Sequence, residues 1–396
     1  MNILEIIFWA FVALVFYTYI GYGIVLYLMV KVKELFVKQK KNSLPDEADL
    51  PEVTLLVAAY NEEAVVKEKM ENSLALDYPV QKLHFLWVTD GSTDQTNILL
   101  EHYGRVKILY QSERQGKTAA LNRAMDYVET PIVVYTDANT MVNRNAIREI
   151  VSCFQDNKVG CVAGEKRIIV KDKDNAAGGG EGLYWKYEST LKRLDGRLYS
   201  AMGAAGELFA IRTELFEKMD TDTLLDDFIL SMRIVKRGYK IAYCAEAYAI
   251  ESGSADMAEE EKRKVRIAAG GLQSIWRLRE LLNIFKYGIV SFQYVSHRVL
   301  RWSITPVALF ALFPLNVWLA INSASSSSCG YGVLLIAQLL FYLAAYWGYA
   351  LSKRQIKNKF LYVPYYFVFM NINVLKGAFY LKKKKGSGAW EKAKRA

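Results

Sequence analysis

VTLLVAAYNEE (53–63), LHFLWVTDGSTD (83–94), VKILYQSERQGK (106–117) and PIVVYTDAN (131–139) share one pattern. Each begins with a short run of β-branched and aromatic residues and ends in polar ones. Such runs predict strands, and the helical stretches between them predict βαβ units around a mostly parallel sheet with helices on both faces. Ligands of such α/β sheets bind beyond the carboxyl ends of the strands. The pattern therefore predicts an α/β fold with a pocket where these polar residues gather.

The polar residues at these strand ends suit a nucleotide and its diphosphate. Tyr60 and Glu62 offer groups for a base or a ribose, and Asp90 can accept hydrogen bonds from either. Lys117 brings a positive charge that we expect near the diphosphate. Each signal has a plain alternative, because acidic and small polar residues also begin helices and a lysine there can be solvated.

Asp137 and Asn139 form a candidate metal site after the last of these strands. Mg²⁺ and Mn²⁺ take oxygen ligands, often one or two carboxylates completed by substrate phosphates. Asn139 contributes an amide oxygen without charge, so we expect a weaker site than two carboxylates would give.

Further candidate residues lie later in the chain. Asp226 and Asp227 stand at the head of an amphipathic segment, where a carboxylate is either a helix-dipole partner or a general base. Arg263 and Arg266 lie three residues apart on one predicted helix face. They could clamp phosphate, or pair with glutamates 259–261.

The first 36 residues predict a membrane anchor. Residues 3–30 carry one charge, Glu5, in an apolar run long enough to cross a bilayer. Lysines follow at once, as is typical of a cytoplasmic boundary. A signal peptide would begin with basic residues and have a shorter apolar run. We interpret 37–50 as a linker and 51–280 as a cytoplasmic catalytic domain.

The last third of the chain predicts a return to the membrane. Residues 281–302 mix apolar, aromatic and basic side chains, which favours a helix in the membrane interface. Within 303–396, spans are expected at about 303–322 and 332–351, before a basic tail. Residues 360–381 could form a third span or an interfacial element. This arrangement predicts a multi-pass protein of the plasma (inner) membrane.

Composition excludes several other classes. The net charge of +10 gathers beside the apolar runs, and no nucleic-acid recognition motif accompanies it, so we expect no nucleic-acid partner. Four cysteines without paired spacing argue against a zinc site. His84, His102 and His297 are widely separated, and we interpret them as structural.

Seven motifs in order carry a family resemblance: AAYNEE (58–63), TDGSTD (89–94), GKTAALN (116–122), TDANT (136–140), GELFAIR (206–212), LLDDF (224–228) and RKVRIAAGG (263–271). This order resembles the inverting, family 2 nucleotide-sugar glycosyltransferases, which have a GT-A catalytic domain. Their membrane-embedded branch includes the synthases of hyaluronan, cellulose and poly-N-acetylglucosamine.

The resemblance implies a role for each matched residue. Tyr60, Glu62 and Asp90 would contact the uridine of a UDP-sugar, and Asp137 with Asn139 would hold Mg²⁺ or Mn²⁺. The remaining roles are a catalytic base at Asp227, a pyrophosphate contact at Arg266, and an acceptor site at Gly206, Glu207, Leu208, Phe209 and Asp226. Ile267 stands where the family has a tryptophan that stacks on the acceptor sugar.

The expected function is therefore transfer of a sugar from a UDP-sugar to a growing polysaccharide. The apolar runs are few for a complete pore, so export would need a second copy of the chain or an export partner. The main alternative is a single addition to a lipid-linked acceptor. Another is a degenerate transferase that binds nucleotide sugars as a scaffold.

Overall fold

The four predicted strands are neighbours in one sheet. They are β1 (Val53–Ala59), β2 (Leu83–Asp90), β3 (Val106–Gln111) and β4 (Ile132–Asp137), and they pair in parallel in the order β3-β2-β1-β4. The computed structural model describes residues 3–37, 44–169, 176–254, 256–322, 325–354, 356 and 358–383. The parallel pairing brings the ends of β1, β2 and β4 to one edge.

The other half of the sheet is mixed. Its strands are β7 (Phe209–Arg212), β6 (Val159–Ile169), β8 (Lys240–Ser252) and β5 (Met141–Val142). Across the described residues the eight-stranded order is β3-β2-β1-β4-β7-β6-β8-β5, with β7 antiparallel to both β4 and β6. The sheet is thus mixed, and most of its pairing is parallel as predicted, since β6 and β8 are parallel as well. Since Phe209 of β7 pairs with Tyr135 of β4, the residues before β7 lie beside the end of β4.

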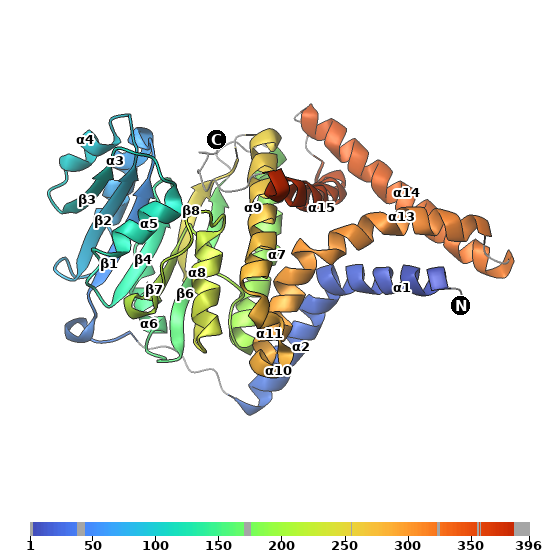
Figure 1. Cartoon of the computed structure of the whole chain (residues 1–396), viewed down its shortest axis with the longest axis horizontal. Helices are drawn as coiled ribbons and strands as arrows, with labels where there is room; N and C mark the ends of the chain where they lie inside the picture. The colour runs from blue at the N-terminus through green and yellow to red at the C-terminus, as the bar shows by residue number, and fades with distance from the viewer. Residues whose placement is uncertain are drawn as a thin grey trace.

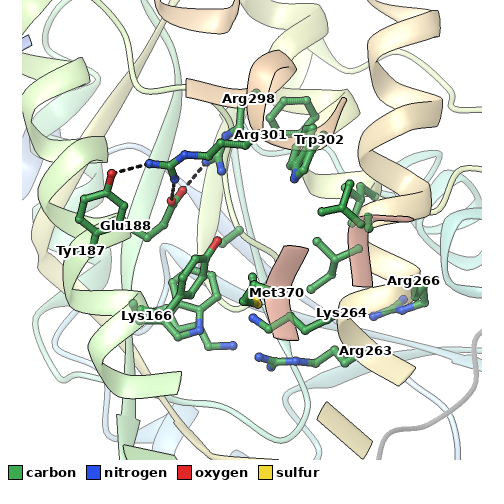
Figure 2. A pocket seen from close by; sticks show the side chains of 18 of the residues that line it. Lys166, Tyr187, Glu188, Arg263, Lys264, Arg266, Arg298, Arg301, Trp302 and Met370 are labelled. Atoms are coloured by element: carbon green, nitrogen blue, oxygen red, sulfur yellow. Dashed lines mark hydrogen bonds and ion pairs between the residues drawn. The ribbon is translucent and has the colours of Figure 1, made fainter. Parts of the chain in front are cut away.

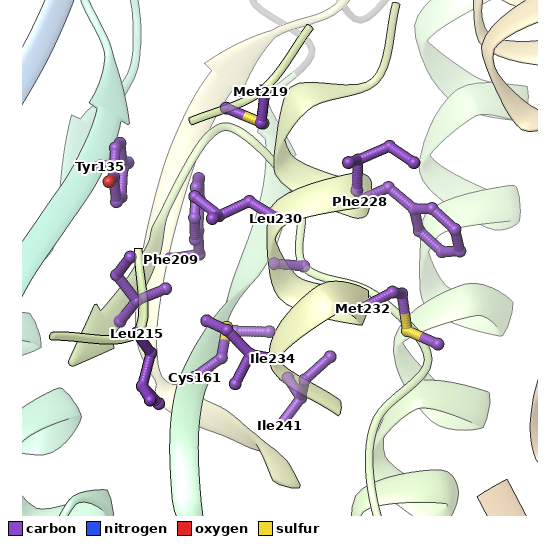
Figure 3. Close-up of a cluster of buried hydrophobic side chains, with 14 of the residues drawn as sticks. Tyr135, Cys161, Phe209, Leu215, Met219, Phe228, Leu230, Met232, Ile234 and Ile241 are labelled. Carbon is purple, nitrogen blue, oxygen red and sulfur yellow. The ribbon is translucent and has the colours of Figure 1, made fainter. Parts of the chain in front are cut away.

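Helices cover both faces of the sheet, as predicted. They are α3 (Glu63–Leu74), α4 (Thr96–Glu101), α5 (Lys117–Met125), α6 (Ala146–Cys153) and α8 (Asp226–Lys236). Alternate residues of β1 face opposite ways, because side chains of a strand have a period of two. Leu56 belongs to the core cluster that includes α5 and α8 residues, and Leu55 to the one that includes α6 residues. Figure 3 shows Leu230 and Ile234 of α8 directed toward the sheet in the first cluster.

Two long helices, α7 (Ala176–Leu198) and α9 (Met257–Arg277), stand beside the sheet (Figure 1). The three consecutive glycines at 178–180 favour a mobile loop from the sequence, but they lie in the first turns of α7. That expectation is corrected for residues 176–182, while 171–175 fall outside the described residues. Short 3₁₀ turns lie at η2 (Glu47–Asp49), η3 (Thr213–Leu215) and η4 (Arg279–Leu282).

Within the part of the chain that the structure describes, three helical segments are long and apolar enough to cross a membrane: Ile3–Phe36, Ile304–Asn322 and Gly330–Lys353. The first comprises α1 (Ile3–Phe16), the π-helix η1 (Tyr17–Gly21) and α2 (Tyr22–Phe36). The others are α13 (Ile304–Asn322) and part of α14 (Ser325–Lys353). In Figure 1, α1, α13 and α14 extend away from the sheet, whereas α2 runs beside α7.

The fourth long helix at this end, α15 (Lys359–Lys383), contains the whole of the ambiguous run 360–381 and is not one of these three segments. It packs on α9 and α14. Residues 284–302 are helical, as α10 (Ile284–Tyr287), α11 (Ile289–Tyr294), η5 (Val295–Val299) and α12 (Leu300–Trp302). We keep the interfacial position of this region as a prediction.

A buried polar network joins the N-terminal helix, the catalytic domain and this later region. Asp195 of α7 accepts hydrogen bonds from the Tyr22 hydroxyl at 2.5 Å and from Gln293 Nε2 at 3.0 Å. His297 of η5 bonds Asp195 through Nδ1 at 2.5 Å and lies 3.3 Å from Glu188 through Nε2. His297 thus links η5 to α7, and its structural role stays a prediction.

Candidate active site

Lys117 and Asp137 form an ion pair at the carboxyl edge of the sheet. Lys117 is the first residue of α5 and follows Gly116, whose φ of 96° lies in the region that favours glycine. Its Nζ lies 2.7 Å from Asp137 Oδ1 and 3.9 Å from Asp226 Oδ2. Burial works against the charged form, but Asp137 and Asp226 outweigh it and raise the pKa of Lys117. The ammonium thus stays charged where a diphosphate was expected.

Asp90 fixes the loop that leads to this lysine. Its side chain is buried and accepts hydrogen bonds from the backbone N–H groups of Gln115, at 3.0 Å, and Gly116, at 2.7 Å. A carboxylate has about four acceptor positions, so these bonds leave capacity for a ligand. The structure therefore gives Asp90 a positioning role that the sequence did not reveal.

Tyr60 and Glu62 lie in the segment between β1 and α3. The guanidinium of Arg114 stacks over the Tyr60 ring, with 3.8 Å between Cζ and the ring centroid. Glu62 is buried, and its backbone N–H donates to Thr96 Oγ1 at 2.8 Å. Arg114 was missed from the sequence, because nothing in its local pattern marks a stacking partner.

The turn after β4 carries the candidate metal ligands. Lys69, a fully buried lysine of α3, donates to Thr136 Oγ1 at 2.9 Å and to the Thr140 carbonyl at 2.6 Å. Burial lowers the pKa of Lys69 to about 7, against the opposing effect of Asp137. Thr136 Oγ1 in turn donates to the Glu207 carbonyl at 2.9 Å, which ties this turn to the segment before β7.

The donor set at this turn suits a weakly held cation. Asp137 supplies a carboxylate and Asn139 an amide oxygen, and one Asp137 oxygen is already bound by Lys117. Among the residues described, no three Asp, Glu, His or Cys side chains gather as a metal site. Because Mg²⁺ often takes its remaining ligands from substrate phosphates, these residues fit a cation that binds with the nucleotide.

Gly206 lies close to both the Lys117–Asp137 ion pair and the Asp227 carboxylate. A β-carbon on Gly206 would lie 3.4 Å from Lys117 Nζ, 3.5 Å from Asp227 Oδ2 and 3.9 Å from Asp137 Oδ2. Three charged side chains from α5, β4 and α8 thus surround one position that carries no side chain. The structure therefore brings together residues that are up to 110 positions apart in the sequence.

Asp226 and Asp227 begin α8, as the sequence predicted. Asp227 Oδ1 accepts a hydrogen bond from the Phe228 N–H at 2.7 Å, which fixes its carboxylate at the helix start. Burial, followed by the neighbouring Asp226 charge, raises the pKa of Asp227 to about 7. A carboxylate with that pKa can take up a proton at neutral pH, which is the property of a general base.

Two of the predicted acceptor residues point elsewhere. Leu208 is 2% exposed and Phe209 is 1% exposed, and both belong to core clusters. Phe209 stacks on Tyr135 with 4.5 Å between ring centroids. The prediction that these side chains contact an acceptor is corrected, because strand β7 turns them into the core. Glu207 remains at the site, where it pairs with Lys166.

A cavity of about 450 Å³ adjoins these residues. Its wall includes the predicted residues Lys117, Gly206, Glu207, Asp226, Asp227 and Arg266. Figure 2 shows Arg266 on α9, across the cavity from Tyr187 and Glu188 of α7. Tyr60, Glu62, Asp90, Asp137 and Asn139 do not line this cavity. Of the residues predicted to bind the nucleotide sugar, Lys117 and Arg266 line this cavity and the others do not.

Arg263 and Arg266 have different surroundings. Arg263 is buried and pairs with Glu260 at 3.3 Å and Glu251 at 4.0 Å, so the sequence alternative of glutamate pairing holds for Arg263. Arg266 makes no ion pair or hydrogen bond with another described residue. Of these two arginines, Arg266 is therefore the one whose guanidinium is available for a phosphate.

An aromatic side chain that the sequence did not single out reaches the cavity from α12. Trp302 packs edge-on against Phe228, with 5.0 Å between ring centroids, and its ring carbons would lie 2.4 Å from a β-carbon on Gly271. Gly271 thus makes room for the indole against α9. Ile267 also lines the cavity but offers no ring. The spacing of 35 residues between Ile267 and Trp302 hid this relationship.

Residues 51–270 match the family described as "Glycosyltransferase like family 2", and they make up more than half of the chain. The chain belongs to glycosyltransferase family 2. This assignment accounts for the order of the seven motifs and makes the protein a transferase. It does not name the donor or the acceptor.

Curated relatives of this family 2 glycosyltransferase differ in their products. The poly-beta-1,6-N-acetyl-D-glucosamine synthase of Staphylococcus aureus is 28% identical over 256 residues, covering 61% of this chain and 60% of the relative. The beta-monoglucosyldiacylglycerol synthase of a Nostoc species is 30% identical over 204 residues, covering 48% of this chain and 42% of the relative. The chain thus matches at most about three fifths of these relatives' length.

Among solved structures, the mannosyltransferase PcManGT from Pyrobaculum calidifontis, determined with GDP-Man and Mn²⁺, has a similar fold. The TM-score is 0.72 at 22% identity, over 97% of this chain and all of the other. The match confirms the GT-A fold and extends to the helices outside the catalytic domain, since it covers nearly the whole chain.

Proposed function

We propose that this glycosyltransferase moves a sugar from a UDP-sugar to an acceptor hydroxyl with inversion at the anomeric carbon. The observation that carries the proposal is the meeting of Lys117, Asp137 and Asp227 around Gly206. In the proposed arrangement the diphosphate and its cation would bind at Lys117 and Asp137, and Asp227 would act as the base close to them. The catalytic domain would face the cytoplasm, where nucleotide sugars are available, from a multi-pass anchor in the plasma membrane.

The donor would bind along the carboxyl edge of the sheet. Tyr60 and Glu62 would contact the uridine, and Asp90 would accept from it while holding the loop before Lys117. Lys117 and Arg266 would bind the diphosphate oxygens. Mg²⁺ or Mn²⁺, held by Asp137 and Asn139, would neutralise charge on the leaving diphosphate.

Asp227 would accept the proton of the attacking hydroxyl. The acceptor oxygen then forms a bond to the anomeric carbon as the bond from that carbon to the diphosphate oxygen breaks. The electron pair leaves with UDP, and the proton stays on the Asp227 carboxylate until solvent removes it. Attack from the face opposite the diphosphate inverts the configuration. Lys117 and Arg266 stabilise the charge that develops on the leaving group, which is often the largest contribution to catalysis.

Two acceptors fit this chemistry. A growing polysaccharide is supported by the synthase relative, and a lipid acceptor by the glycolipid synthase relative. A lipid acceptor has a second support, because one wall of the cavity comes from η1 and α15. Product length separates the two: labelled donor gives a ladder of products for a polymer and a single addition product for a lipid.

The decisive experiment replaces the proposed base. Asp227→Asn should abolish transfer while donor binding, measured by titration with UDP, changes less than about twofold. Asp126→Asn, an exposed carboxylate far from the site, is the matched control and should keep full activity. Donor turnover is measured as UDP release over a panel of UDP-sugars, with the anomer of the product read by NMR. Release at the wild-type rate by Asp227→Asn refutes the assignment, and binding without release for every donor supports a scaffold instead.

A further inference from the structure

The cavity is strongly basic. Eight of its lining side chains are lysine or arginine and four are aspartate or glutamate. Figure 2 shows Arg298 and Arg301 at one end and Arg263, Lys264 and Arg266 at the other. Such an excess of positive charge in a hollow of about 450 Å³ favours an anionic ligand.

Most of these basic side chains have an acidic partner in the protein. Arg298 and Arg301 pair with Glu188 at 2.7 Å and 3.3 Å. Lys264 pairs with Glu260 at 3.3 Å. Lys166 pairs with Glu207, as described above, and with Glu251. These pairs balance part of the positive charge of the cavity wall.

Lys192 is different. It belongs to α7, lines the cavity and is only 5% exposed. It makes no hydrogen bond or ion pair with any residue that the structure describes. A buried ammonium without an anionic partner is costly, because desolvation of the charge is not repaid. Consistent with this, burial and the nearby Arg298 lower the pKa of Lys192. An anion delivered by a ligand would supply the missing partner.

Lys192 lines the cavity together with Asp227 and Arg298. Asp137, which is proposed to hold the cation of the donor, does not line it. An anion beside Lys192 would therefore share the cavity with the proposed base Asp227.

The wall of the cavity formed by α15 is largely apolar. Val363, Phe367, Met370 and Val374 line it, together with two tyrosines and Asn371. Val363 is also 56% exposed, so this face of α15 continues from the cavity to the outside of the protein. Since Ile3–Phe36, which includes η1, is long and apolar enough to cross a bilayer, this wall borders the region where lipid is expected.

We propose that the cavity binds an amphiphilic acceptor whose phosphate pairs with Lys192 and whose hydrocarbon chain lies along α15. The phosphate would take the position beside Lys192 and Arg298, and the chain would contact Val363, Phe367 and Met370. This inference rests on the proposed function and deepens it, because it names the acceptor class. It places the acceptor hydroxyl on the Asp227 side of the phosphate.

Binding of a simple amphiphile to the full-length chain in detergent tests the proposal. The probes are farnesyl phosphate, farnesol and inorganic phosphate, each titrated against fluorescence of the cavity tryptophans Trp185 and Trp302. Farnesyl phosphate should bind at least about tenfold more tightly than either other probe, because a charge-assisted hydrogen bond and a buried chain are both needed. If farnesol binds as tightly as farnesyl phosphate, the cavity has no phosphate site and the proposal fails. If inorganic phosphate binds as tightly, the hydrocarbon chain makes no contact and the proposal fails.

Variants of Lys192 test whether this lysine is the residue that binds the phosphate. Lys192→Met should reduce farnesyl phosphate affinity to that of farnesol, and Lys192→Arg should restore most of it. Lys186→Met, on an exposed face of the same helix, is the matched control and should bind as the wild type. Unchanged affinity in Lys192→Met overturns the proposal.

Titration with UDP keeps this inference separate from the proposed function. UDP should bind wild type and Lys192→Met within about twofold, because Lys192 is not among the residues proposed to bind the donor. If Lys192→Met loses UDP binding, the lysine holds the donor and the acceptor inference fails. If wild type itself neither binds UDP nor releases it from any UDP-sugar, the proposed function fails, whatever farnesyl phosphate does.

Discussion

Lys117 Nζ lies 2.7 Å from Asp137 Oδ1, so the first residue of α5 is tied to the last residue of β4. Lys117 contributes the positive charge of this pair, at the carboxyl edge of the sheet and beside the residues proposed to hold a divalent cation. Asp90 supports it indirectly by binding the backbone N–H of Gly116. In the proposed function, Lys117 would balance part of the charge on the leaving diphosphate.

Lys117→Met should lower kcat/KM by about 10²–10³, the typical effect of removing one group that stabilises transition-state charge. The methyl thioether keeps the volume and removes the charge. Steady-state UDP release measures the loss, and Lys158→Met, on the exposed surface, should leave it unchanged. A loss below about threefold would mean that Lys117 serves only to hold Asp137.

The pH dependence of transfer should follow Asp227. Its pKa is raised to about 7 by burial and by Asp226, so the unprotonated base is scarce below pH 7 and abundant above it. We expect kcat/KM to rise with pH, about tenfold per unit below 7, and to level off above. Initial rates of UDP release in constant ionic strength between pH 5 and 9 give this profile.

Variants of two charged neighbours of Asp227 test whether Asp227 is the group that gives this pH profile. Asp226→Asn removes a negative charge that raises the pKa, so the rising limb should move to lower pH. Lys117→Met removes a positive charge that lowers it, so the limb should move to higher pH. A limb that stays in place in both variants belongs to another group.

Asn139→Asp should strengthen metal dependence. A second carboxylate beside Asp137 raises the negative charge of the ligand set, and affinity for hard cations follows that charge. We expect removal of metal with EDTA to reduce activity of the wild type, and Mg²⁺ or Mn²⁺ to restore it. In Asn139→Asp, half-maximal restoration should require on the order of tenfold less metal. Equal requirements would show that Asn139 is not a ligand.

The parallel half of the sheet could be predicted because its signals are local. Each of β1, β2 and β4 is a run rich in apolar, β-branched or aromatic residues with a polar residue at its end or directly after it, and parallel pairing brings those ends together. The antiparallel pairing of β7 with β4 could not be predicted, because it depends on where the chain returns to the sheet after α7. This pairing is also why Leu208 and Phe209 point into the core while Gly206 lies at the site.

Residues that act through contacts distant in the sequence were also missed, because no local pattern marks such contacts. Lys69 supports the Asp137 turn from a helix 67 residues earlier than Thr136, and Trp302 reaches the cavity from beyond the catalytic domain. Lys192 looks like any lysine of a helix with mixed charges. Its burial and lack of a described partner become visible only when α7 is packed against the sheet and η5.

The Asp195–His297 contact should be essential to stability rather than to chemistry. His297 is fully buried and lies 2.5 Å from Asp195 and 3.3 Å from Glu188, so it joins α7 to η5. His297→Phe would leave both carboxylates with fewer partners in a buried site. Loss of one partner from such a network costs about 3–5 kcal/mol of unfolding free energy.

Thermal unfolding of the detergent-solubilised chain measures this cost. His297→Phe should lower the Tm by several degrees, while UDP affinity measured at low temperature stays near that of the wild type, because the polar partners that the structure describes for His297 are Asp195 and Glu188 and not the residues proposed to bind the donor. His102→Ala, an exposed histidine of the catalytic domain, is the matched control and should leave the Tm unchanged. A normal Tm for His297→Phe with lost transfer would instead place His297 in the catalytic machinery, and would show that the network serves the acceptor cavity rather than the fold.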